Sequence, residues 1–203
     1  YDLRGQALGL TALSLVLACI VAAFFVDNPV PFWVYATAIV AEFVLIISMW
    51  FIRSPTAETI ILFLFVGASS LVLSPTINFA IEVGGEIIVF QALGITAAIV
   101  LIAFAYVTYT NVDLTFMWKY LIIGLIFFLI GGFVIFLFVA SDLAYLLYSI
   151  IGAVLFTLYL LFDLSRLNQQ RFYSPARMAL SIYIDILLLF QYILQILLLS
   201  EER

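Results

Sequence analysis

The sequence predicts an all-α integral membrane protein in which seven helices cross the bilayer as a bundle. Of the 203 residues, 67% are hydrophobic and only 9% are charged, and the mean hydropathy is +1.33. A soluble domain of ordinary composition carries about 25% charged residues. Apolar windows of about 20 residues, the length that crosses a bilayer as a helix, recur along the whole chain. No window alternates in polarity as the strands of a membrane barrel do.

Seven apolar segments fill the chain, and we expect them to form one transmembrane domain over residues 1–203. Proline, glycine, asparagine or charge ends each segment. In chain order these interruptions are DNPVP, RSPTAE, EVGGE, TNVDLT, ASD and SRLNQQRFYSPAR, of which the last is the longest and most basic. The predicted spans are residues 6–26, 32–52, 58–80, 87–109, 116–138, 142–164 and 177–199.

The distribution of charge predicts the orientation. With a cytoplasmic N-terminus, six of the 7 basic residues lie on the cytoplasmic side and Arg203 alone lies outside, as the positive-inside rule requires. The C-terminus is then outside. The predicted outer connectors are acidic, and they either concentrate cations or simply keep helix ends in water. Short connectors favour a prokaryotic cytoplasmic membrane. The outer acidic residues are Asp27, Glu82, Glu86 and Asp142.

Composition argues against several classes of protein. Histidine is absent and Cys19 is the single cysteine, so disulfide frameworks, thiolate metal clusters and the usual titrating group at neutral pH are missing. The net charge of −5 argues against a nucleic-acid partner. Lys119, the single lysine, lies in the fifth predicted span rather than the last, which disfavours a retinal protein. We expect no bound cofactor.

Four ionisable residues lie inside predicted spans or at their ends, where a charge at mid-helix costs about 2.5–3.5 kcal/mol. Glu42 is near the middle of the second span, and Arg53 follows on the same predicted helix face, about 16 Å along the axis. Asp163 is at the cytoplasmic end of the sixth span, and Asp185 is about 12 Å into the seventh. Because one connector joins these two spans, we expect them to be antiparallel neighbours. Their aspartates can then meet, with Arg53 at the same membrane face.

Two carboxyl groups held together in a poorly hydrated site are expected to share one proton and to titrate as a unit. Arg53 can compensate one negative charge, so the pair is a candidate pH-sensitive latch. Alternatively, Asp163 ends its helix in water and pairs with Arg166 three residues on. Carboxylate oxygens also suit Ca²⁺. Asp163, Asp185 and Glu42 are therefore candidate transient ligands of a passing Ca²⁺ ion.

The third predicted span contains Pro75 among serine, threonine and asparagine residues. Proline removes a backbone hydrogen bond, and a span tolerates this where neighbouring hydroxyls satisfy the freed carbonyl. Pro75 is then either a kink that only packs or a hinge beside a water-filled path. In the fifth span, the Gly131–Gly132 pair favours close helix packing.

Several stretches together resemble the transmembrane Bax inhibitor motif family, also called Bax inhibitor-1-like. YSIIGAVLFTLYLLFDLSRL and MALSIYIDILLLFQYIL are similar to its last two spans, AEFVLIISMWFIR to its second and LVLSPTI to its third. The resemblance covers essentially the whole chain. It implies a seven-helix fold with a pH-sensitive calcium leak pathway, in which Asp163 and Asp185 are a di-aspartyl sensor. It also implies that Arg53 is the lock and that Glu42 lines the path.

Other functions stay open. A proton-coupled calcium or cation exchanger would use the same carboxylates alternately, although the two halves show no convincing repeat. A stress- or apoptosis-modulating membrane protein would act through protein contacts. An intramembrane aspartyl protease also carries aspartates on two spans, but the sequences around Asp163 and Asp185 lack its glycines. We therefore expect no enzyme, and the expected partners are calcium ions, protons and the lipid bilayer.

Overall fold

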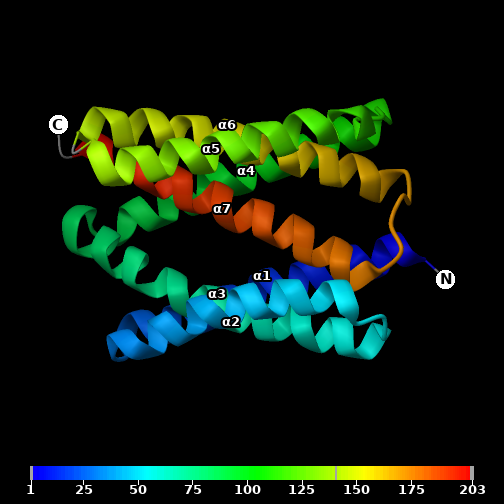
Figure 1. The fold of residues 1–203 in the computed structure, drawn as a ribbon, viewed down its shortest axis with the longest axis horizontal. Helices are drawn as coiled ribbons and strands as arrows, with labels where there is room; N and C mark the ends of the chain where they lie inside the picture. The colour runs from blue at the N-terminus through cyan, green and yellow to red at the C-terminus, as the bar shows by residue number, and fades with distance from the viewer. Residues whose placement is uncertain (1, 140, 202–203) are drawn as a thin grey trace. The chain divides into compact units, whose positions relative to one another are not determined.

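The computed structural model describes residues 2–139 and 141–201, without the side chain of Glu201. Within these residues the structure consists of helices joined by short connectors and contains no strand (Figure 1). Seven of the described helices are long and apolar enough to cross a membrane, which confirms the predicted fold class. They are α1 (Leu3–Asp27), α2 (Phe32–Phe51), α3 (Pro55–Gly84), α4 (Glu86–Thr110), α5 (Trp118–Phe138), α6 (Asp142–Asn168) and α7 (Pro175–Glu201), with the 3₁₀ helix η1 (Thr115–Met117) before α5.

The helix bounds follow the predicted spans and extend several of them. α3 begins at Pro55. Proline is tolerated in the first turn of a helix, because the backbone N–H that it lacks would have no partner within the helix there. α6 continues to Asn168, so Asp163 lies inside the helix rather than at its end. Arg203 falls outside the described residues, and the orientation of the chain in the membrane stays a prediction.

Two compact units are present within the predicted single domain. The first contains residues 1–82 and 172–183, which are α1, α2, α3 and the beginning of α7. The second contains residues 83–171 and 184–203, which are α4, α5, α6 and the rest of α7. The continuous helix α7, drawn from orange to red in Figure 1, therefore belongs to both units.

In the first unit, α3 supplies most of the core. The ring of Phe65 packs edge-on against Tyr183 of α7, with 6.2 Å between ring centroids. One turn further along α3, Ser69 Oγ is hydrogen-bonded to the Tyr183 hydroxyl at 2.8 Å, and both side chains are buried. Towards the other end of α3, Asn78 Nδ2 donates to the Val26 carbonyl of α1 at 3.3 Å. These contacts connect α3 to both α1 and α7.

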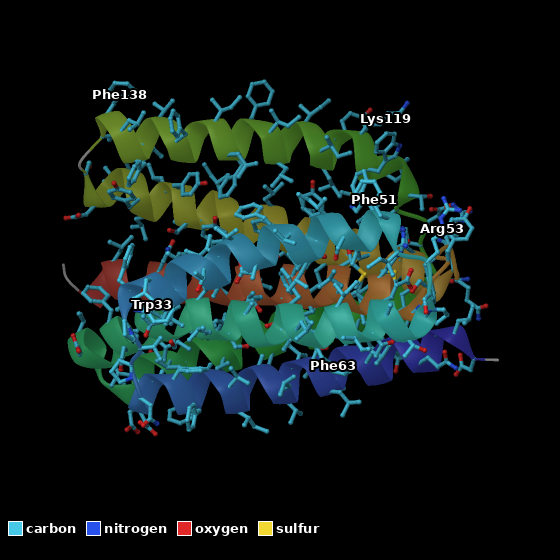
Figure 2. All side chains as sticks on the ribbon, turned by 60° about the horizontal axis from the view of Figure 1, so that its bottom comes forward. Trp33, Phe51, Arg53, Phe63, Lys119 and Phe138 are labelled. Carbon is cyan, nitrogen blue, oxygen red and sulfur yellow. The ribbon has the colours of Figure 1, made fainter. Side chains whose placement is uncertain are left out.

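Two helices expose most of their apolar side chains. Trp33 and Phe51 lie at opposite ends of α2, as Lys119 and Phe138 do in α5 (Figure 2), and all four are exposed. In each helix only 11% of the most apolar window is buried within the protein. Hydrocarbon rather than water is the solvent that suits such surfaces, so the exposure agrees with a position facing lipid.

The helix α3 runs without a break across Pro75. Proline cannot donate to the carbonyl four residues earlier, which is that of Leu71. The hydroxyl of Ser74 donates to this carbonyl instead, at 2.8 Å. The predicted compensation by a neighbouring hydroxyl is thus confirmed, while the role of Pro75 as a hinge stays a prediction.

The second unit is built around α6, against which both α4 and α5 pack. Four aromatic rings from α5, α6 and α7 meet in its interior. Phe128 stacks on Tyr148 with 4.2 Å between ring centroids, and Phe156 stacks on Tyr192 with 5.7 Å. Gly152 lies beside them: a Cβ atom there would come within 2.9 Å of both Phe128 and Tyr192.

The two glycines of the Gly131–Gly132 pair differ in their surroundings. A Cβ atom at Gly132 would collide with the Tyr148 hydroxyl, so this glycine permits close packing of α5 on α6, as predicted. A Cβ atom at Gly131 would meet nothing within 4 Å. The packing argument therefore applies to Gly132 alone.

Candidate functional site

The structure brings Asp163 of α6 and Asp185 of α7 together in the second unit. Both are buried, with 2% and 5% of their surfaces exposed. Their carboxyl groups are close enough to interact through a side-chain hydrogen bond and through their charges. Ionised carboxylates can only accept hydrogen bonds, so a hydrogen bond between them needs a proton on one. The geometry is therefore that of a carboxyl pair able to share one proton.

Asp163 also forms an ion pair with Arg166, whose Nη1 lies 3.1 Å from Oδ1 of the aspartate. The guanidinium of Arg166 lies over the ring of Phe162, 5.5 Å from its centroid. This ion pair is the one that the alternative interpretation of Asp163 predicts. The water-exposed helix end of that interpretation is wrong, however, because α6 continues for five residues and Asp163 is buried. Asp163 thus interacts with both Arg166 and Asp185.

The surroundings of Asp185 are less polar. Its Oδ2 atom is buried and accepts no hydrogen bond from a donor in the part of the chain that the structure describes. The hydroxyl of Tyr159, one turn before Asp163 on α6, is close enough to interact electrostatically with both aspartates. Charge left on an unpaired buried oxygen is expensive. Sharing a proton with Asp163 lowers that cost.

Glu42 and Arg53 belong to the first unit. Glu42 is half-buried in α2 and interacts electrostatically with Tyr183 of α7. Arg53 is exposed beyond the end of α2 (Figure 2). The prediction that the two share a helix face is wrong, because α2 ends at Phe51 and Ile52 is extended. The nearby Ser54–Pro55 step explains this end, since proline disfavours a helical conformation in the residue before it.

An ion pair in the first unit, between the buried carboxylate of Glu58 and the partly exposed Arg177, was not predicted. Glu58, in the first turn of α3, is 4% exposed. Its Oε1 atom accepts a hydrogen bond from Nε of Arg177 at 2.9 Å and forms an ion pair with Nη2 at 2.8 Å. Its Oε2 atom accepts a hydrogen bond from the Ser174 hydroxyl. Arg177 Nη2 also donates to the Ile52 carbonyl at 2.6 Å. We call Glu58, Ser174, Arg177 and the Ile52 carbonyl the Glu58 clamp.

One sequence signal could have indicated the Glu58 clamp. The third and seventh predicted spans begin on the same membrane face, and each carries a charge of opposite sign in its first residues, Glu58 and Arg177. We counted both among the residues of the connectors that interrupt the apolar segments. Their meeting depends on how the helices pack, which hydropathy does not describe.

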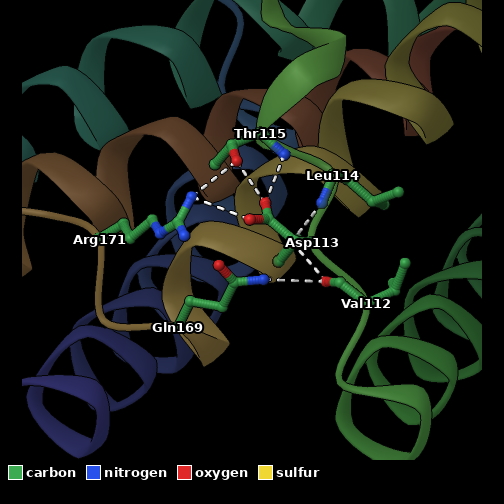
Figure 3. A network of polar contacts seen from close by, with 7 residues as sticks. Val112, Asp113, Leu114, Thr115, Gln169 and Arg171 are labelled. Carbon is green, nitrogen blue, oxygen red and sulfur yellow. Dashed lines mark hydrogen bonds and ion pairs between the residues drawn. The ribbon is translucent and has the colours of Figure 1, made fainter.

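The connector between α4 and α5 is held on the end of α6 by a second polar network (Figure 3). The buried hydroxyl of Ser165 donates to the Val112 carbonyl at 2.8 Å and accepts a hydrogen bond from the Leu114 N–H at 3.0 Å. Gln169 Nε2 donates to the same Val112 carbonyl at 3.2 Å. Ser165 is two residues from Asp163, so this network fixes the part of α6 that carries the aspartate.

Asp113 is the charged member of this connector. It accepts hydrogen bonds from the Thr115 hydroxyl and N–H, and it forms an ion pair with Arg171 at 3.0 Å. The hydrogen bonds from Thr115, followed by the charge of Arg171, hold the pKa of the Asp113 carboxyl below its usual value. Asp113 is therefore ionised at neutral pH.

The fold and the site define a multi-pass membrane protein with a buried carboxyl pair between two of its spanning helices. The chain belongs to the Bax inhibitor-1-like family: residues 5–202 match the family described as inhibitor of apoptosis-promoting Bax1. The resemblance on which the sequence interpretation relied is thus confirmed.

Bacterial proteins are among the relatives. A Vibrio cholerae protein described as an uncharacterized membrane protein is 35% identical over 136 residues, which are 66% of this chain and 60% of the relative. An uncharacterized Helicobacter pylori protein is 32% identical over 172 residues, 84% of this chain and 73% of the relative. With the seven apolar helices, these relatives support the predicted multi-pass location in a prokaryotic membrane.

Proposed function

We propose that the protein is a pH-sensitive calcium leak channel in which Asp163 and Asp185 form the gate. The observation that carries this proposal is the contact between two buried carboxyl groups on α6 and α7, both helices long and apolar enough to span a membrane. Membership of the Bax inhibitor-1-like family supports a membrane rather than an enzymatic role.

Charge balance gives the proposed gate its pH response. With one shared proton, the two aspartates carry one negative charge, and Arg166 balances it. Loss of the proton leaves a second negative charge beside the first. At about 4 Å in an effective dielectric of about 20, two such charges repel by about 4 kcal/mol. A divalent cation offsets this repulsion, so the deprotonated pair attracts Ca²⁺.

The family resemblance extends the proposal to the first unit. Glu42 is proposed as a residue of the ion path, because one half-buried carboxylate binds a cation weakly enough to release it. Arg53, which is exposed beyond the end of α2, is proposed as the lock because the family resemblance implies this role.

Calcium flux into liposomes between about pH 5 and 8 tests the proposal. We expect Asp163→Asn and Asp185→Asn to abolish the pH dependence, because neither variant has a proton to share. Glu42→Gln should reduce the flux. The matched control is Asp27→Asn, which neutralises an exposed aspartate at the end of α1 and should leave the pH dependence unchanged.

Three results would contradict the channel. An unchanged pH response in both aspartate variants would remove the gate. Flux that strictly requires an opposing proton gradient would make the protein a proton-coupled exchanger. Full cellular activity of all charge-neutral variants would assign the function to protein contacts instead.

A further inference from the structure

One face of α6 carries a row of mostly polar or small residues. The members follow one another at spacings of three or four residues, which places them on one side of the helix. In chain order they are Ser149, Gly152, Phe156, Tyr159 and Asp163, and we call them the α6 seam. Phe156 is the one residue of the seam with an apolar side chain. The seam is therefore a polar strip, interrupted once, along a helix that is otherwise apolar enough to cross a membrane.

The α6 seam lies against α7 in the second unit. At one end, Ser149 Oγ donates a hydrogen bond at 3.1 Å to Oε1 of Gln195, which is exposed. About 10 Å further along α6, the ring of Phe156 stacks on Tyr192. About 10 Å beyond that ring lies the contact between the two aspartates. Polar groups of the two helices thus extend from the exposed Gln195 to the buried aspartate pair, except at Phe156.

Oxygen atoms lie on both sides of Phe156. Towards the aspartates, the Tyr159 hydroxyl is close enough to both carboxyl groups to interact with them electrostatically. On the other side, the hydroxyls of Tyr148 and Tyr192 are close enough to share a hydrogen bond. Carboxylate and amide oxygens are ligands of hard cations, and hydroxyls can donate hydrogen bonds to water or accept them. Both parts of the seam therefore suit a hydrated cation.

The ring of Phe156 separates these two parts. Its centroid lies 5.7 Å from that of Tyr192 and 6.0 Å from that of Tyr159, and the ring of Phe128 packs edge-on against it. In the part of the chain that the structure describes, no ring contact joins Tyr159 directly to Tyr192. Gly152 has no side chain to hold the rings of Phe128 and Tyr192 away from the seam. The result is an apolar constriction, which excludes water and thereby ions.

We propose that Phe156 is the hydrophobic barrier in a cation route along the α6 seam, between the exposed end at Gln195 and the aspartate pair. The inference deepens the proposed function, because it adds a second closure to the route that the aspartate gate controls. It depends on that function only where calcium flux is measured. The barrier is closed in this structure, and opening requires the ring of Phe156 to leave the seam.

Access of a thiol reagent tests the barrier without any measurement of ion flux. In a Cys19→Ser background, Tyr159→Cys places the single cysteine on the aspartate side of Phe156. The probe is a positively charged, membrane-impermeant methanethiosulfonate, added to right-side-out and to inverted membrane vesicles. Ser200→Cys, at an exposed position near the end of α7, identifies the membrane face nearer to the Gln195 end of the seam.

Substitutions of matched size separate polarity from volume. The side chains of asparagine and leucine have the same number of heavy atoms, so Phe156→Asn and Phe156→Leu remove similar volumes. From the Gln195 face, we expect Phe156→Asn to accelerate the reaction of Tyr159→Cys by about an order of magnitude, because water enters a polar constriction more readily than an apolar one. Phe156→Leu should leave the reaction slow.

Phe128→Asn is the control for position. Phe128 and Phe156 are both 6% exposed, and both rings contact Tyr192. Among the described residues, however, only the ring of Phe156 also contacts Tyr159. Phe128→Asn should therefore leave the reaction slow, although it also places a polar group in the aromatic core.

Three results would overturn the barrier. They are an unchanged rate in Phe156→Asn, an equal acceleration in Phe128→Asn, and a fast reaction from the Gln195 face while Phe156 is intact. If Phe156→Asn does not fold, Phe156→Thr and Phe156→Val give the same comparison of polarity at matched size, with a single hydroxyl.

Calcium flux into liposomes then connects the barrier with the proposed function. At the pH at which the wild type conducts best, the aspartate gate is open, so Phe156→Asn should raise the flux and Phe156→Leu should not. If Phe156→Asn admits the thiol reagent but leaves the flux unchanged, the cation route does not follow the α6 seam and the proposal is wrong. If wild-type liposomes pass no calcium at any pH, the proposed function fails, and the thiol reaction alone decides whether Phe156 is a barrier.

Discussion

Replacement of Gly152 by alanine tests how tightly the aromatic rings of the second unit pack. The added methyl group would lie 2.9 Å from the Phe128 ring and 2.9 Å from two atoms of the Tyr192 ring. Neither ring can retreat easily, because Phe128 is stacked on Tyr148 and Tyr192 on Phe156. We therefore expect the rings to be forced apart.

Two opposing contributions set the magnitude. Alanine is more favourable than glycine inside a helix by about 0.5–1 kcal/mol. Overpacking of a well-packed core costs about 1–3 kcal/mol. Gly152→Ala should therefore lower the free energy of unfolding by up to about 2.5 kcal/mol. Gly94→Ala is the matched control, because a methyl group at this exposed position of α4 meets nothing within 4 Å. Its free energy of unfolding should rise by the helix contribution alone, about 0.5–1 kcal/mol.

Thermal unfolding of the two variants in one detergent measures the difference between their free energies of unfolding. Because both variants gain the same helix contribution, this difference gives the cost of overpacking alone. A difference of about 1–3 kcal/mol is expected, with Gly94→Ala more stable than the wild type and Gly152→Ala less stable. If Gly152→Ala unfolds at the same temperature as Gly94→Ala, the rings yield without cost and the reasoning is refuted.

Three further predictions concern single polar interactions. Ser74→Ala should lower the free energy of unfolding by about 1–3 kcal/mol, because the Leu71 carbonyl loses its hydrogen bond. The loss should be smaller in a Pro75→Ala background, where the backbone N–H of residue 75 can donate to this carbonyl. Unfolding of the two single mutants and the double mutant measures the difference. Ser165→Ala should accelerate amide exchange in the connector between α4 and α5, because two hydrogen bonds disappear. The pKa of Asp113 is lowered from its ordinary value of 3.8, so the ion pair with Arg171 stabilises the connector fully at pH values above 3.8. This stabilisation is lost as the pH falls through the lowered pKa. Asp113→Asn should thus accelerate exchange at pH 7 and have no effect well below pH 3.8.

Each of these has a clear contrary result. An equal cost of Ser74→Ala in both backgrounds would mean that Pro75 does not create the need for the hydroxyl. Unchanged exchange in Ser165→Ala would show that other contacts hold the connector. An effect of Asp113→Asn that is equally large in strong acid would exclude the ion pair as its cause.

The spanning helices could be predicted from the sequence because the bilayer restricts the chain. Backbone groups in hydrocarbon must be satisfied within the segment, so long apolar runs form helices. The ends were predictable where proline and glycine interrupt the runs, as at DNPVP before α2. The contact of Asp163 with Asp185 was also predictable, because a single connector joins the two helices that carry them.

The Glu58 clamp and the position of Arg53 were not predicted, for related reasons. Five arginines lie on the predicted cytoplasmic face, and the sequence does not indicate which of them meets a given carboxylate. In the structure, Arg177 forms an ion pair with Glu58, and Arg166 forms one with Asp163. The one-residue difference between the predicted and observed end of α2 was enough to remove Arg53 from the helix face of Glu42.

The long sequence separation within the Glu58 clamp has a consequence for biosynthesis. Arg177 follows Glu58 by 119 residues. At about 5–20 residues per second, the ribosome needs about 6–24 seconds to make that length of chain. Glu58 therefore enters the membrane long before its guanidinium partner has been synthesised. We expect α1, α2 and α3 to insert early but to reach their final packing only when α7 arrives, so a helix made much later completes the assembly of these three.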